Sequence, residues 1–174
     1  MDAPEPRRNL ERKARCADLD GARAALARLG ARCEGVQWQT DVYFPVASGR
    51  LKLRFIEGQP ALLIGYQRPD QGPARLSAYY LVPVSDPVLL RTALAAALGV
   101  RGEVRKRREV HHWHNVRIHL DEVEGLGRFV EFEAVLAPGA DPAESREFLR
   151  QLGEVLALEA TADTVGSYAD QLGL

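Results

Sequence analysis

The sequence predicts an antiparallel α+β fold in which eight strands can close into a barrel. Three observations lead to this class. Eight strand candidates occur in the chain, most of them are joined by short turns, and the helical segments are inserted between strands instead of alternating with them. This order differs from the repeating strand–helix units of a parallel sheet.

Size and composition are those of one ordinary globular domain. The chain has 174 residues, 46% of them hydrophobic, and we expect a single domain at 9–174 after a loose leader at 1–8. The net charge of −1 gives no argument for nucleic acid or an anionic membrane as a partner. The chain shows neither a membrane-spanning run of about 20 apolar residues nor a signal peptide. Its two cysteines are too few for a disulfide framework, so we expect a cytoplasmic protein.

The first half of the chain combines one helix with most of the strands. The helix is expected at 18–29, with Asp18 as its candidate N-cap and Gly30 as its stop. Residues 50–56 (RLKLRFI) alternate most cleanly, with basic side chains on one face and apolar side chains on the other. The strand candidates of this half are 9–16, 34–44, 50–56, 61–67 and 75–84.

The second half adds three helices and three strands. A helix at 86–98 has Pro87 in its first turn and Gly99 just beyond its end. The other predicted elements are a long strand at 103–113, a hairpin of two strands within 116–133, a helix at 141–156 and a short helix at 163–172.

The hairpin within 116–133 (VRIHLDEVEGLGRFVEFE) contains a possible half of a metal site. Its two strands alternate apolar and charged residues around a Gly-Leu-Gly turn, so Asp121, Glu131 and Glu133 can face the same way. Carboxylate oxygens are the ligands that hard divalent cations prefer. A hairpin with its charged face in water is the alternative, and it is the more common arrangement for such strands.

The histidines at 111, 112 and 114 are close in sequence, as in some metal sites, but they do not all share one face of the strand. Adjacent residues on a strand face opposite sides, so only His112 and His114 share a face. We interpret this stretch as a solvated strand end near a turn, with metal binding as the alternative.

Composition leaves open which face of the strands lines the barrel. The apolar face usually points inward, but each amphipathic helix must also bury its apolar stripe. Helices packed outside the barrel would turn the charged faces inward. Because a buried unpaired charge costs several kcal/mol, a charged interior is reasonable only as a wet cavity for a polyanion. The inward side chains would then include Lys52, Arg54, Lys106, Arg108 and Arg117.

An ordered series of segments resembles one family. The run 9–13 (NLERK) resembles the ExExK signature of the CYTH superfamily, the class IV adenylyl cyclases and thiamine triphosphatases that are also called triphosphate tunnel metalloenzymes. Each piece is weak alone, and their shared order carries the resemblance. The further matching segments are 39–44 (QTDVYF), 49–54 (GRLKLR), 66–68 (YQR), 106–109 (KRRE), 120–127 (LDEVEGLG), 129–133 (FVEFE) and 167–170 (SYAD).

The resemblance implies an eight-stranded antiparallel barrel with helices outside and a charged tunnel within. By position, the candidates for binding a triphosphate are Lys13, Lys52, Arg54, Arg68, Lys106, Arg108 and Arg117. The candidates for holding Mg²⁺ or Mn²⁺ are Glu11, Asp121, Glu131 and Glu133, which together with Lys13 form the expected catalytic set. His119 shares the strand face of Arg117 and Asp121 and is also expected to reach the tunnel.

The expected activity is metal-dependent hydrolysis of a phosphoanhydride in inorganic triphosphate, thiamine triphosphate or ATP. Glu11, Glu131 and Glu133 would hold one metal, and a second metal or Asp121 would orient the attacking water. The alternative is a class IV-type cyclase, in which the ribose 3′-hydroxyl attacks the α-phosphorus and ATP yields cyclic AMP and pyrophosphate. The partner is in each case a small-molecule triphosphate, bound by a monomer or homodimer.

One position departs from the family signature. Asn9 stands where ExExK has its first glutamate, and an amide offers a metal a carbonyl oxygen without a negative charge. The substitution should weaken the metal site, shift its metal preference or remove one of two metals, without disturbing triphosphate binding. A non-catalytic triphosphate-binding or nucleotide-binding protein is therefore a further alternative.

Overall fold

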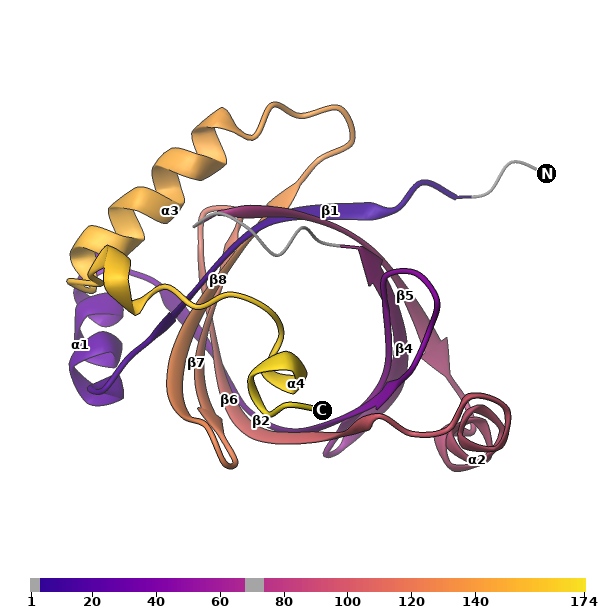
Figure 1. The fold of residues 1–174 in the computed structure, drawn as a ribbon. Helices are drawn as coiled ribbons and strands as arrows, with labels where there is room; N and C mark the ends of the chain where they lie inside the picture. Colours follow the sequence, from indigo (N-terminus) through magenta and orange to yellow (C-terminus); the bar gives the residue numbers. More distant parts are fainter. Residues whose placement is uncertain (1–3, 68–73) are drawn as a thin grey trace.

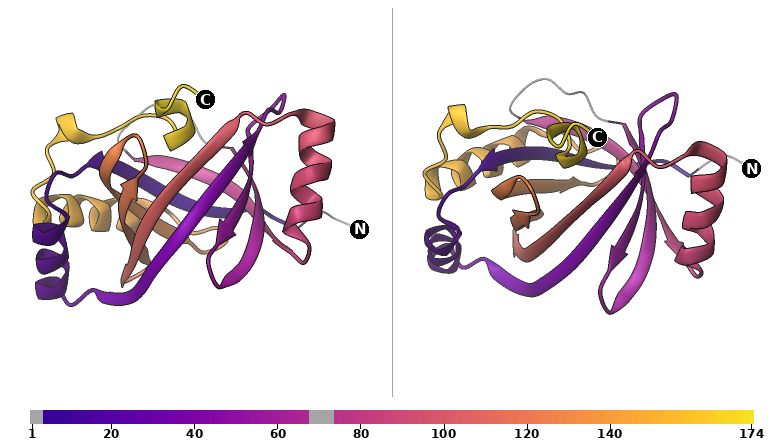
Figure 2. Two further views of the ribbon diagram at one scale, coloured as in Figure 1. Left: turned by 90° about the horizontal axis from the view of Figure 1, so that it is seen from below. Right: turned by 60° about the horizontal axis from the view of Figure 1, so that its bottom comes forward.

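The computed structural model describes residues 4–67 and 74–174, in which eight antiparallel strands form a closed barrel. Figure 1 looks along this barrel, and Figure 2 shows it from two further directions. Around the barrel the strands follow the order β1-β5-β4-β3-β2-β6-β7-β8. The predicted eight-stranded α+β barrel with helices packed outside is confirmed.

The strands lie close to their predicted positions, although β1 begins two residues before the predicted start. Their bounds are β1 Arg7–Arg15, β2 Arg32–Phe44, β3 Arg50–Ile56, β4 Gln59–Gln67, β5 Arg75–Val84, β6 Gly102–Trp113, β7 Val116–Val123 and β8 Gly127–Leu136. The helices are α1 Leu19–Leu29, α2 Pro87–Leu98, α3 Ala143–Val155 and α4 Tyr168–Gln171, with a 3-10 turn at Ala160–Ala162. Within the described part of the chain, every helix is too short or too polar to cross a membrane.

The main hydrophobic core lies outside the barrel. On β1, Leu10 faces outward while its neighbour Glu11 lines the interior, and the same alternation runs along β7 and β8. The outward side chains of these three strands pack against α1 and α3, which cover one side of the barrel in Figure 1. On the opposite side, Leu90 and Leu94 of α2 pack on a smaller cluster around Leu53. The helices thus bury the apolar faces and leave the charged faces to the interior.

The C-terminal segment differs from its prediction as one helix at 163–172. Asp163 forms an isolated bridge with Ala14, and the amide of Thr164 donates to the carbonyl of Lys13, so this part runs along β1. The helix begins only after Ser167, whose hydroxyl accepts from the Asp170 amide while the Asp170 carboxylate accepts from the Ser167 amide. These local hydrogen bonds set a later start than hydrophobic spacing indicated.

Helix α4 covers one end of the barrel. Figures 1 and 2 together place α4 and the C-terminus over the strand ends at this mouth. Asp170 binds Arg50 and Arg101 at 2.9 Å each; Arg50 is the first residue of β3, and Arg101 immediately precedes β6. Tyr168 reaches from α4 into the barrel and lines its cavity.

Candidate active site in the barrel tunnel

The barrel encloses a cavity of about 390 Å³ whose lining combines charged and uncharged side chains. Nearly all the predicted site residues are brought together there. The predicted triphosphate-binding residues that line it are Lys13, Lys52, Arg54, Lys106, Arg108 and Arg117. The remaining one, Arg68, lies outside the described residues. Of the predicted metal ligands, Glu11, Glu131 and Glu133 line the cavity, as does His119.

One group of side chains, which we call the basic cluster, consists of Lys52, Arg54 and Lys106 around Asp41. Strand pairing places Asp41 directly opposite Arg54, whose Nε and guanidinium NH2 donate to the two carboxylate oxygens at 2.6 and 2.8 Å. The Nζ atoms of Lys52 and Lys106 lie 2.9 and 3.7 Å from Asp41 Oδ2. One carboxylate therefore holds three cations together.

Burial and charge set the protonation states of the basic cluster. Burial raises the pKa of Asp41, but Arg54, Lys52 and Lys106 outweigh it and hold that pKa well below its ordinary value. Burial and the nearby Arg54 lower the pKa of Lys52 to about 8. Burial and Arg108 lower the pKa of Lys106. An additional anion would stabilise the charged forms of both lysines.

A second group, which we call the acidic cluster, consists of His119, Glu131 and Glu133. One ligand atom of each lies within 4.8 Å of the others. His119 and Glu131 are opposite each other in the β7–β8 pairing, with His119 Nδ1 at 3.4 Å from Glu131 Oε2 and 3.8 Å from Glu133 Oε1. Strand β1 pairs with the other side of β8, and there Glu11 is the register partner of Glu133. The strand pairing thus gathers three carboxylates and one imidazole.

The protonation states of the acidic cluster suit a divalent cation. Burial and then Arg108 lower the pKa of His119, so its imidazole is neutral at pH 7. Burial raises the pKa of Glu131, but Lys13 and Arg108 hold it well below its ordinary value. Neutral imidazole and ionised carboxylate are the forms that bind metals. Carboxylates fit Mg²⁺ or Mn²⁺, and the imidazole is the more familiar ligand of transition metals.

Arg108 connects the acidic cluster to Asp121. It donates to Asp121 at 2.7 and 2.6 Å and to Glu131 at 2.6 Å. The Tyr168 hydroxyl also donates to Asp121, at 2.8 Å. Asp121 is completely buried and is not part of the cavity lining that the described residues form. The structure therefore places Asp121 where it orients Arg108, apart from the other predicted metal ligands.

Asn9, the departure from the family signature, is buried at the cavity wall. Its exposed fraction is 2%, and its Oδ1 has no hydrogen-bond partner within the described chain. A buried acceptor without a partner costs about 1–3 kcal/mol. An amide oxygen in this state fits a cation or a donor from a ligand, although it contributes no charge.

Two functional residues were not predicted, although both lie in segments that carried the family resemblance. Asp41 organises the basic cluster, and Tyr168 holds Asp121 while its ring lies 3.8 Å from Lys13 Nζ. Asp41 alternates with apolar neighbours along 34–44, which could have indicated an inward carboxylate. No local pattern indicates that Tyr168 enters the barrel.

Comparisons with known proteins agree with this architecture. The fold is similar to PH1012 from Pyrococcus horikoshii OT3, with a TM-score of 0.84 and 24% identity over 93% of this chain and 98% of that one. It is also similar to a proposed adenylate cyclase from Vibrio parahaemolyticus (TM-score 0.80, 17% identity, 98% and 100% covered). A third similar structure is HpAC1 from Hippeastrum, reported with a dominant triphosphatase activity (TM-score 0.63, 15% identity, 86% and 88% covered).

These structural similarities concern the fold alone. No match was found among curated proteins. A family model described as the CYTH domain matches residues 7–168, which include all eight strands. The chain therefore belongs to the CYTH domain family.

Proposed function

We propose that this protein is a metal-dependent enzyme that binds a triphosphate compound in its tunnel and hydrolyses a phosphoanhydride bond. The observation that carries the proposal is the presence of the basic cluster and the acidic cluster on the walls of one cavity. Membership of the CYTH family supports a triphosphate-binding tunnel enzyme. The triphosphatase activity reported for HpAC1 favours hydrolysis.

The tunnel cations are the triphosphate-binding groups in this proposal. In the structure each faces a carboxylate, as with Arg54 at Asp41 and Arg117 at Glu133, because unpaired buried charges are costly. A triphosphate supplies alternative anionic partners, and the planar guanidinium groups match its oxygens in pairs. Binding would therefore exchange internal ion pairs for contacts to the ligand.

The acidic cluster, with Glu11 beside it, would hold Mg²⁺ or Mn²⁺. When Lys13 and Arg108 turn toward phosphate, Glu131 is released for this role. A bound divalent cation would supply charge neutralisation on the phosphate oxygens. Asp121 and Tyr168 would keep Arg108 in place beside the same phosphate, where positive charge stabilises the transition state.

Cyclisation of ATP is the second candidate. The uncharged part of the tunnel wall, formed by Ile56, Leu62, Ile64 and Leu81, favours it because an adenine ring could lie there. The similar structure from Vibrio parahaemolyticus, described as a proposed adenylate cyclase, also favours cyclisation. The two activities differ in their products: cyclic AMP and pyrophosphate for the cyclase, and no cyclic product for the hydrolase.

The proposal is tested by incubating the protein with inorganic triphosphate, thiamine triphosphate and ATP, each with Mg²⁺ or Mn²⁺, and identifying the products. We expect hydrolysis of at least one compound. Glu131→Gln should lower kcat on the order of 100-fold or more while most triphosphate binding remains, because it alters a central metal ligand. Glu122→Gln, on the same hairpin but exposed, is the matched control and should keep its activity.

Each possible result decides between the alternatives. Triphosphate binding without any turnover would reject the enzyme and leave the non-catalytic binding protein that Asn9 suggests. Release of cyclic AMP would favour the cyclase. An equal loss of binding and turnover in Glu131→Gln would argue against its role as a metal ligand.

A further inference from the structure

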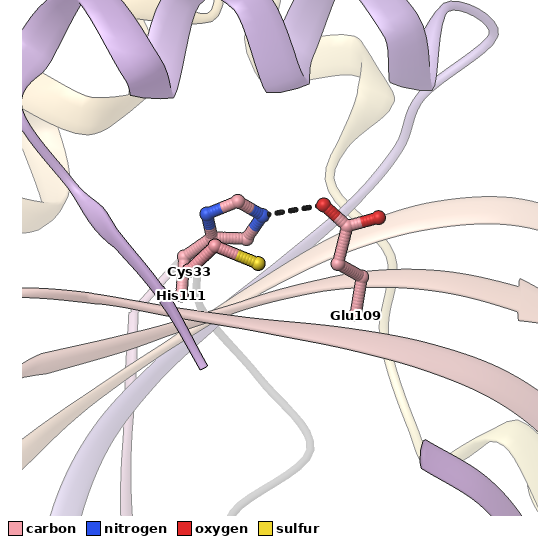
Figure 3. Close-up of side chains that lie close together, drawn as sticks. All are labelled: Cys33, Glu109 and His111. Atoms are coloured by element: carbon pink, nitrogen blue, oxygen red, sulfur yellow. Dashed lines mark hydrogen bonds and ion pairs between the residues drawn. The ribbon is translucent and has the colours of Figure 1, made fainter. Parts of the chain in front are cut away.

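A second group of metal-ligating side chains lies on the outer face of the barrel. Cys33 on β2 and Glu109 and His111 on β6 supply a thiol, a carboxylate and an imidazole (Figure 3). One ligand atom of each lies within 4.8 Å of the others. These side chains are on the strand faces opposite to the tunnel, so the group is separate from the acidic cluster.

Strand pairing fixes the relative positions of the three residues. Cys33 is the register partner of His111, and Glu109 is two residues away on the same face of β6. A β-bulge lies between Cys33 and Gly35, whose φ of 139° suits glycine. Glu34 is the extra residue of this bulge. If pairing continued regularly from Gly35, Glu34 would lie opposite His111 and Cys33 would face the tunnel. The bulge therefore brings the thiol to the imidazole.

The burial of the group suits an ion that enters from solvent. Glu109 and His111 are 5% and 4% exposed, while Cys33 is exposed. Two ligands are thus held by packing, and the third side leaves room for entry and for a water molecule. Three protein ligands and one water complete the tetrahedral coordination that zinc prefers.

Arg23 on helix α1 orients the carboxylate of Glu109. Arg23 donates to Glu109 from Nε at 3.0 Å and from its NH2 group at 2.9 Å. Glu109 Oε1 also lies 2.8 Å from His111 Nε2. Hydrogen bonds of this kind to the ligating groups are a regular feature of metal sites. The geometry positions Glu109 beside the imidazole before any ion binds.

The charges and ligand types favour a thiophilic dication. Arg23 is balanced by Glu109 and by Asp20, which lies 2.5 Å from its NH1 group, so these three carry a net charge of −1. Ionisation of Cys33 would add a further negative charge. Thiolate and imidazole select Zn²⁺ and similar metals, whereas Mg²⁺ prefers oxygen ligands alone.

We propose that Cys33, Glu109 and His111 form a binding site for a thiophilic divalent cation such as Zn²⁺, distinct from the tunnel site. Binding releases the proton of the Cys33 thiol to solvent. The imidazole proton that His111 Nε2 shares with Glu109 moves to Nδ1, so that Nε2 and the carboxylate coordinate the ion in place of their hydrogen bond. The ion cross-links β2 to β6. Glu34 and His112, the neighbours of these ligands in sequence, line the tunnel and contact each other at 2.5 Å, so the site lies directly behind one part of the tunnel wall.

The test uses Co²⁺ as a spectroscopic probe on the metal-free full-length chain under reducing conditions. Thiolate coordination gives Co²⁺ a sulfur-to-metal charge-transfer absorption, which a tunnel site built from carboxylates and imidazole does not produce. We expect this absorption to reach the same final amplitude in the wild type and in Glu131→Gln, and to disappear on addition of Zn²⁺.

Variants of the two cysteines provide a matched pair. Cys33→Ser should abolish the absorption and weaken Zn²⁺ binding about 100-fold, as an order-of-magnitude expectation for a lost ligand. Cys16→Ser removes the other thiol and should change neither measurement. His111→Gln should weaken Zn²⁺ binding by a similar factor. The proposal is overturned if wild-type protein shows no thiolate absorption, if Cys33→Ser keeps it, or if Cys16→Ser loses it.

Discussion

The basic cluster and the acidic cluster occupy one tunnel but balance their charges differently. In the basic cluster, one carboxylate, Asp41, holds three cations. In the acidic cluster, Glu131 and Glu133 each have a cation of their own, from Lys13 and Arg117, beside a neutral imidazole. One wall therefore carries an excess of positive charge, and the other carries ligands that become available when their cations move.

This difference in charge balance suits the basic cluster to binding an anion and the acidic cluster to binding a metal. An excess of cations around one acid favours the arrival of an anion, whereas paired carboxylates can exchange their cations for a metal. Neither cluster would be stable if its charges were left unpaired in the barrel interior. The resting ion pairs thus keep the fold stable and hold both walls ready for a ligand.

The largest effect should follow from removing the acid of the basic cluster. Asp41→Asn leaves the buried Lys106 and the half-buried Lys52 and Arg54 close together without their carboxylate, and should lower the free energy of unfolding by about 3–5 kcal/mol. Inorganic triphosphate should restore part of this loss, because it binds only the folded state. Urea denaturation with and without triphosphate measures both effects.

The control for this variant is Glu147→Gln, which breaks an exposed ion pair with Arg150 on α3 and should leave the unfolding transition unchanged. If triphosphate stabilised wild type and Asp41→Asn equally, the basic cluster would not be the anion site.

A smaller effect should follow from removing one cation of the same cluster. Arg54→Ala should weaken triphosphate binding about 10- to 100-fold, the range expected for loss of a charge-assisted contact of about 1.5–3 kcal/mol. Asp41 keeps two lysine partners, so the fold should persist. Calorimetric titration measures the affinity, with the exposed Arg105→Ala on the same barrel as control. An unchanged affinity would remove Arg54 from the binding site.

The smallest effect should be a pH dependence of triphosphate affinity that arises in the basic cluster. Lys52 has its pKa lowered to about 8, so it is cationic below that pH and neutral above it. Triphosphate affinity should therefore fall as pH rises through 8, by less than about tenfold for one contact among several. Lys52→Arg should reduce this decline, because arginine stays protonated. Affinities measured on both sides of pH 8 without metal test this, and identical profiles for the two proteins would contradict it.

The sequence indicated the faces of the strands better than the partners of their side chains. The period of two placed Lys52 and Arg54 on one face, and the ordered resemblance turned that face inward, as the structure confirms. The contacts of a side chain depend on the register between neighbouring strands. This register is set by closure of the whole barrel. For this reason Asp41 went unnoticed and the contact of Asp121 with Arg108 was not foreseen.

Two further differences have equally local causes. The helix predicted at 163–172 is shortened because Asp163 pairs with β1 and Ser167 caps a later start. The strand end with His111 was interpreted as solvated, with metal binding as the alternative, but His111 is 4% exposed. A β-bulge in β2 places Cys33 beside it, and such a bulge gives no clear signal in the alternation. Periodicity predicts the facing of residues in regular helices and strands. Both differences occur at irregular places, one before the cap of α4 and one at the β-bulge in β2.

Closure of the barrel also limits how much strand backbone is open to another copy of the chain. The outer face of β5 exposes Leu76, Tyr80 and Val82 by 40–51%, a combination that would promote aggregation on the edge of an open sheet. Here β1 pairs with residues 75–79 of β5 and β4 pairs with residues 78–84, so each part of the strand has one side of its backbone occupied within the barrel. The ring of strands that shapes the tunnel thereby also reduces the amount of strand backbone that is open to pairing with a second chain.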